Sequence, residues 1–270
     1  FGDVVFRLSA PTVNRSYCTQ YKETDLAFAL RLMQEEGLFF YFEHKKDGHT
    51  LIITDSSINA GPIAGYSPVL RYSTDEILES NQVVTSFVSR RKFTSGSVAL
   101  KTGDYKAPGA RRYVERDTAV DQGEVDNYEL YDYLGAHGFP DSDRGEQLAR
   151  FRTEALAAHS KIFVGKSHYR RLELERYFEL DAHYDHEQAK PEDRQFLLTS
   201  IRHHGTNNYQ AKPESQILTA PDSAIYTAEF RCIRKKIPYR PLLTSPRPMI
   251  HGVQTAVVVG PKGEEIYTDR

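Results

Sequence analysis

One short stretch restricts the fold of this chain more than any other: an amphipathic segment that becomes strongly apolar after a single glycine. Between Thr24 and Gly37 the apolar residues follow the i, i+3, i+4, i+7 spacing of one helical face. They are Leu26, Ala29, Leu30 and Met33. Thr24 is suited to be the N-cap, and Gly37 can adopt the left-handed conformation that ends a helix. We therefore predict a helix that ends where a strand begins.

The strand that follows is expected to be buried. Leu38 to Phe42 form an uninterrupted apolar and aromatic run, which is typical of a strand covered on both faces. The Asp47-Gly48 pair signals a tight hairpin, and "LIITD" returns as the second strand. Residues 1–60 are therefore predicted to form a helix that leads into a β-hairpin.

Strand patterns dominate the middle of the chain, residues 61–238. The clearest are "KIFVG", "YFELDAHY", "RQFLLTSIRHHG" and "SAIYTAEFRCIRK". A second amphipathic helix is predicted from about Asp143 to His159, with Ser142 as its N-cap. The segment from Lys106 to Asp143 reads as irregular, apart from the strand-like "YELYDYLG". The fold class is predicted as α+β, mostly antiparallel sheet with two main helices.

The character of the chain changes at 239–270. The segment "KIPYRPLLTSPRPMIHG" predicts an extended, stiff connector. Its stiffening residues are expected to be Pro238, Pro241, Pro246, Pro248 and Gly252. The closing "VQTAVVVGPKGEEIYTD" reads as strand, turn, strand, which we interpret as the first hairpin of a further β-barrel. Because the chain starts at Phe1 without a methionine or a signal pattern, and ends directly after a strand, we expect a piece of a longer protein.

Composition argues against several functions. A net charge of −2 and a pI near 6.6 disfavour general binding to nucleic acid. No window approaches the ~18 consecutive apolar residues of a membrane span. Cys18 and Cys232 are too far apart in sequence for a CxxC motif, and we expect both to be small buried residues in strands.

No catalytic, cofactor or metal site is predicted. "HYDHE" offers His183, Asp185 and His186, but as a strand it would place His186 on the opposite face from the other two. Adjacent His203 and His204 diverge for the same reason. Paired acids such as Glu264/Glu265 are common by chance in a chain with 37 acidic residues. No GxSxG, phosphate-binding loop or HExxH motif occurs.

Three stretches resemble one known family. They are "YCTQYKETDLAFALRLMQEEGLFFYFEH", "YELYDYLG" with "RGEQLARFRTEAL" and "FLLTSIRHHG", and "IPYRPLLTSPRPMIHGVQTAVVVGPKGEEIYTD". In family order and over nearly the whole chain, they resemble the VgrG spike proteins of bacterial type VI secretion, which are similar to contractile phage tail hubs and spikes. One departure is Leu134, where the family pattern leads us to expect proline before Gly135.

The resemblance implies barrel-like hub domains, with residues 239–270 entering an OB-fold barrel. It implies a homotrimer that joins a tube of hexameric Hcp rings to a needle, with effector or PAAR-type tip proteins bound beyond this segment. It also implies assembly in the bacterial cytoplasm, export without a signal peptide, and membrane contact only by puncture. On this reading the helix-to-strand joint is architectural, and the charged side of the helix, with Lys22, Glu23 and Arg31, is a subunit contact or a wet surface.

Three other functions remain open at this point. One is the baseplate hub of a contractile phage or phage-derived tail. A second is an enzyme acting on cell-wall or carbohydrate polymer, although the motif search favours a non-enzyme. The third is a carbohydrate-binding β module, which only the seventeen tyrosines favour.

Overall fold

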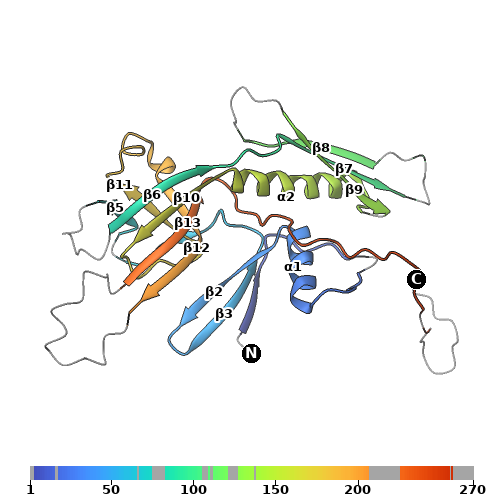
Figure 1. Ribbon diagram of the computed structural model, residues 1–270, viewed down its shortest axis with the longest axis horizontal. Coiled ribbons are helices and arrows are strands. Elements are labelled where there is room, and N and C mark those ends of the chain that lie inside the picture. The colour runs from blue at the N-terminus through green and yellow to red at the C-terminus, as the bar shows by residue number, and fades with distance from the viewer. Residues whose placement is uncertain are drawn as a thin grey trace.

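The computed structural model describes residues 3–15, 18–65, 67–74, 83–104, 109, 112–120, 127–136, 138–206, 226–255 and 257. Within these ranges, two α-helices accompany three separate sheets (Figure 1). The predicted class, mostly β with two main helices, is confirmed. The predicted hairpin at 253–269 lies mostly outside the described residues. The predicted limits 1–60, 61–238 and 239–270 stay predictions.

The first sheet is mixed and has the order β1-β3-β2. It comprises β1 (Asp3–Arg7), β2 (Phe39–Lys45) and β3 (Gly48–Thr54). α1 (Asp25–Glu35) precedes β2 as predicted: the Thr24 side chain accepts a hydrogen bond from the Ala27 amide, and Gly37 has φ 66°. A side chain at that φ is strained, so glycine lets the chain pass from helix to strand at once.

One sequence expectation about β2 is wrong for the described chain. Phe39 and the neighbouring Ile52 are buried, but Phe40 and Phe42 remain 41% and 42% exposed. At β2 and β3 the sheet is therefore covered on one face only, and the apolar side chains Phe40 and Phe42 lie on the uncovered face.

The second sheet has the order β12-β13-β10-β6-β5-β11-β4. Because β11 also pairs with β12, the six strands from β12 to β11 close into a barrel. Its strands are β5 (Val69–Tyr72), β6 (Val83–Arg91), β10 (Lys161–Ser167), β11 (Arg176–Asp181), β12 (Gln195–Gly205) and β13 (Tyr226–Arg234), with β4 (Gly61–Pro62) beside β11 and a 3₁₀ turn at Pro191–Asp193. Rings fill the interior: Phe87, Phe163, Phe178, Phe196 and Phe230 are all at most 3% exposed. Burial of aromatic rings is the main stabilising term for such a core.

The third sheet has the order β8-β7-β9 and packs on α2 (Ser142–Ser160). Its strands are β7 (Ser97–Gly103), β8 (Arg112–Asp117) and β9 (Glu129–Ala136). The prediction of an irregular segment from 106 to 143 is therefore wrong at β8, where the charged sequence "RYVERD" hid the alternation, whereas the strand-like "YELYDYLG" is confirmed as β9. The N-cap of α2 is Asp141 and not Ser142, because the Asp141 carboxylate accepts from the Arg144 amide.

Candidate functional site at the proline-rich connector

After β13 the connector runs without regular structure past α2 and on toward α1 and β9 (Figure 1). Together with both helices it lines a half-open cleft of about 1140 Å³. The lining combines apolar side chains such as Leu148 and Leu243 with arginines and carboxylates. A connector of this composition would be solvated if it were free, so the contacts that hold it in place define the site.

Arg240 is the most buried of these contacts, at 8% exposed. Its Nε donates to Glu154 of α2 at 2.8 Å, and its Nη1 donates to the Gly37 carbonyl at 3.0 Å and to the Asp55 carbonyl. The guanidinium also lies 4.6 Å from the centre of the Phe151 ring. One side chain thus joins the connector to α2, to the glycine joint after α1 and to the end of β3.

Gln34 of α1 makes the next contact along the connector. Its Oε1 accepts hydrogen bonds from the backbone amides of Thr244 and Ser245, both at 3.0 Å, and its Nε2 donates to the Thr244 hydroxyl at 3.3 Å. A side-chain amide bonded to successive backbone groups replaces the strand partner that an extended segment lacks. The connector is therefore fixed in register along α1.

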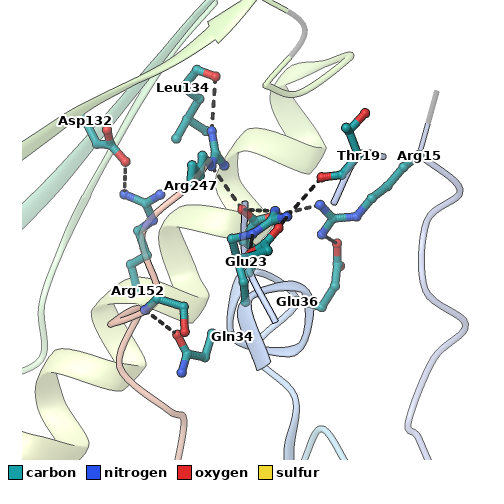
Figure 2. Close-up of polar contacts among 12 residues, drawn as sticks. Arg15, Thr19, Glu23, Gln34, Glu36, Asp132, Leu134, Arg152 and Arg247 are labelled. Carbon is teal, nitrogen blue, oxygen red and sulfur yellow. Dashed lines mark hydrogen bonds and ion pairs between the residues drawn. The ribbon is translucent and has the colours of Figure 1, made fainter. Parts of the chain in front are cut away.

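Arg247 makes the outermost contact. Its Nε donates to Glu35 at 3.0 Å, and its Nη1 donates to the Leu134 carbonyl of β9 at 3.1 Å (Figure 2). Burial alone would raise the pKa of Glu35, but Arg15 and Arg247 outweigh burial and hold that pKa below its usual value. Leu134, the departure from the expected proline, is itself buried at 7% exposed in the core under α2.

Ion pairs beneath the connector join α1 to α2. Glu36 accepts from Arg144 of α2 at 2.6 and 2.7 Å. It also accepts from Arg15 at 2.7 Å (Figure 2). Arg152 pairs with Asp132 of β9 at 2.6 Å. Because these pairs are partly buried and share carboxylates, they form a network that orients the elements more than isolated surface pairs would.

The charged side of α1 was expected to be a subunit contact or a wet surface; Lys22 is exposed, whereas Glu23 and Arg31 pair with each other. Arg31 is only 5% exposed, and it pairs with Glu23 at 2.6 Å and donates to the Thr19 carbonyl. Instead, Leu26 on the predicted apolar side is 67% exposed. The predicted apolar face of α1 is therefore only partly covered, with Leu30 and Met33 half-buried.

The predicted joint residues lie along this path without making its polar contacts. Pro241 and Pro248 line the cleft, and Pro238 lines a second cavity of about 750 Å³. Pro246 and Gly252 are exposed. Their stiffening role stays a prediction. Sequence reasoning missed Arg240, Gln34 and Arg247; the arginines that alternate with prolines in "PYRPLLTSPRP" were the available signal.

Two neighbouring histidines of "HYDHE" belong to the packed interior of the barrel. His183 and His186 lie in turns after β11, are 1% and 7% exposed, and pack against the Phe87 ring. They therefore share an interior, contrary to the strand interpretation. Burial, with the neighbouring His183, lowers the pKa of His186 to about 4, so the ring is neutral at pH 7. In the described ranges no three metal-ligating side chains gather.

The two cysteines differ from one another. Cys232 is fully buried in β13, as expected, whereas Cys18 is exposed and belongs to no strand, so that half of the expectation is wrong. Among the described helices, none is long and apolar enough to span a bilayer.

A barrel, a helix-backed sheet and a connector bonded to both helices define a structural hub, the class of protein that organises other parts around a rigid frame. Residues 2–209 match the family model of the phage tail baseplate hub (GPD), and the chain belongs to that family. Its fold also resembles two solved structures. One is the E. coli c3393 protein, described as a component of the type VI secretion system with similarity to the T4 tail proteins gp27 and gp5; its TM-score is 0.56 at 18% identity, over 93% of this chain and 48% of that one. The other is the tail protein of Neisseria meningitidis MC58, with a TM-score of 0.59 at 10% identity, over 87% of this chain and 62% of that one.

Among curated proteins, the whole chain aligns with type VI secretion system spike proteins of Pseudomonas aeruginosa. It is 33% identical to VgrG1b and 30% identical to VgrG1a. The chain spans 35% and 40% of the length of these two relatives. The resemblance to VgrG proteins is therefore confirmed, and the chain corresponds to about a third of such a protein.

Proposed function

We propose that this chain is the hub portion of a type VI secretion spike, a structural adaptor that connects a tube to a needle. The observation that carries the proposal is the connector: it leaves the barrel and is bonded in sequence to α2, α1 and β9 through Arg240, Gln34 and Arg247. Because the connector is bonded at three points, a displacement of the connector would also displace the helices and the sheet to which it is bonded. This is what a part between tube and needle requires.

In this proposal the hub works as a homotrimer. The trimer sits on hexameric Hcp rings, and regions outside residues 1–270 bind effectors or a PAAR-type tip. The prolines of the connector stiffen the passage toward an OB-fold barrel. The polypeptide is assembled in the cytoplasm, leaves without a signal peptide, reaches the outside at the needle tip and meets membranes only by puncture. Three chains around one axis require heterologous contacts that close into a ring.

We also propose that residues 1–270 are not an enzyme. The titratable side chains of the joint are committed to ion pairs. One similar protein is named as an actin cross-linking toxin, VgrG1 of Vibrio cholerae, but the match spans only 23% of it at 27% identity. Hydrolysis of purified peptidoglycan by this chain would contradict the proposal.

A phage or phage-derived baseplate hub is the second candidate, favoured by the family model and by the Neisseria tail protein. Both candidates require the same frame. They differ in the tube that the hub binds, which is a type VI Hcp ring in one and a tail tube in the other.

Light scattering on the full-length polypeptide tests the proposal. We expect the mass of three chains at micromolar concentration and retention of that complex by immobilised Hcp rings. A trimer that ignores Hcp but binds a tail tube would indicate the phage candidate. A monomer at all concentrations would overturn both.

A further inference from the structure

The outward face of the β1-β3-β2 sheet is apolar without interruption. Strand register places two rows on it: Val4, Leu51 and Phe42 form one, and Phe6, Ile53 and Phe40 form the other. The four side chains on the outer strands are exposed: Val4 51%, Phe6 64%, Phe40 41% and Phe42 42%. His44 and His49 close one end, with the His49 ring 5.5 Å from Phe42.

The barrel of the same chain shows how a solvated face is built here. Along its outer wall Arg90, Lys166 and Arg231 point away from the core and are exposed. A sheet with one wet face normally alternates in this way between apolar inside and polar outside. The β1-β3-β2 sheet alternates as well, but its uninterrupted apolar rows lie on the exposed face: the opposite face carries Thr50 and the ion pair of Arg7 with Glu43 at 2.7 Å. The apolar face is therefore the one that the described residues leave uncovered.

The dimensions of the face fit one helix. Three strands spaced about 4.8 Å apart place the outer strands about 10 Å from one another, close to the diameter of an α-helix. Neither described helix covers the face: α2 packs on β7 and β8, and α1 buries its charged side under the connector. The relatives supply further polypeptide, since this chain spans only 35–40% of VgrG1b and VgrG1a.

We propose that this face is the docking site of an amphipathic helix from another segment of the same spike polypeptide, outside residues 1–270. The helix lays an i, i+3, i+4, i+7 apolar stripe across the two rows. It thereby completes a layer that the described residues leave open on one side. The inference concerns intrachain packing and does not depend on the trimer or on Hcp binding.

Cysteine labelling tests the proposal. Phe40→Cys and, separately, Phe42→Cys are introduced with Cys18→Ser into both the 270-residue chain and the full-length polypeptide, and the rate of maleimide labelling is measured. Val88→Cys on the barrel wall, where Val88 is 55% exposed, is the matched control. We expect labelling at positions 40 and 42 to be at least about tenfold slower in the full-length polypeptide, and labelling at position 88 to be equal in both.

Two results would overturn the inference. One is equal labelling at positions 40 and 42 in the two polypeptides. The other is protection in the 270-residue chain that grows with protein concentration, because a second copy would then cover the face. A photo-crosslinker at position 42 identifies the occupant: crosslinks within one chain to residues at helical spacing support the proposal, and crosslinks at alternate residues, as in a strand, contradict it.

Discussion

Arg240 is the residue on which the joint depends most, because it satisfies Glu154 and two backbone carbonyls from a position that is 8% exposed. Arg240→Ala leaves those acceptors unpaired, and we expect the free energy of unfolding to fall by about 3 kcal/mol. Arg240→Lys should recover only part of that loss, because an ammonium cannot reproduce the forked contacts. Urea unfolding measures both.

Arg247→Ala is the matched control, since the Arg247 side chain is 43% exposed. Its removal should cost less than about 1 kcal/mol. Equal losses for the two arginines would show that burial does not set their contributions.

Glu175 is a second residue with a measurable signature. It has φ 57°, and its Oε1 has no hydrogen-bond partner among the described residues. Burial raises its pKa to about 7, against a small opposing effect of Arg176. Above about pH 4.5 the unfolded state releases the proton of this carboxyl, whereas the folded state keeps it up to about pH 7. The free energy of unfolding therefore falls as the pH rises from about 4.5 to 7, and above pH 7 the contribution of this group stays lost.

Glu175→Gln should remove that slope, and it should raise the free energy of unfolding at pH 8 by about 2–3 kcal/mol relative to the unmodified chain. Denaturant unfolding between about pH 5 and pH 8 measures it. Glu173→Gln, a change at a 56% exposed neighbour, should leave the profile unchanged. A profile that is already flat in the unmodified chain would contradict this assignment.

At the scale of elements, α2 meets its sheet through a glycine. A Cβ on Gly145 would lie 2.9 Å from Phe139 and 3.0 Å from Val114. Alanine improves helix propensity by about 1 kcal/mol, but overpacking costs about 1–3 kcal/mol. We therefore expect Gly145→Ala to lower the unfolding midpoint, while Arg150→Ala on the exposed side of α2 stays near neutral. A stabilised Gly145→Ala chain would show that the two core side chains move aside.

The connector is the other element whose stiffness is testable. Replacing both Pro246 and Pro248 by glycine should speed proteolysis and amide exchange from about 243 onward, because glycine widens the conformations open to the chain. The unfolding midpoint of the barrel should not change, because the contacts of Arg240 and Gln34 with the rest of the fold do not involve positions 246 and 248. Loss of barrel folding in this variant would refute the proposed role of the two prolines.

These elements also show what sequence could predict. The caps and glycine of α1 are local, so Thr24 and Gly37 were identified correctly. The orientation of α1 was not, because Gln34 bonds to Thr244 and Ser245, which lie 210 and 211 residues further along the chain, and no local period records such contacts. The strand β8 was missed for a related reason: Val114 is its one buried residue, and the half-buried Arg112 beside it pairs with Asp104, outside the strand.

At the scale of the whole molecule, the elements are joined both by polar contacts and by a small apolar cluster, in which Ala158 of α2 packs against Leu197 and Ile233 of the barrel. The apolar clusters of the barrel and of the β8-β7-β9 sheet are separate, and arginine pairs join α1, α2 and the connector between them. The resemblance of the sequence to spike proteins predicts the architecture without these contacts. It did not point to Arg240, because family resemblance identifies a fold but not the individual side-chain contacts that stabilise it.

The three connector contacts are arranged in series along the chain, and this order governs how the joint would yield to tension. A pull on the connector from beyond residue 250 reaches Arg247 first, then the Gln34 contacts at Thr244 and Ser245, and Arg240 last. The exposed bond breaks early and re-forms easily, while the buried one breaks late. Under a small load, the connector would therefore detach reversibly at Arg247 while the contacts of Arg240 stay in place. The barrel would be disturbed only after Arg240 has also detached.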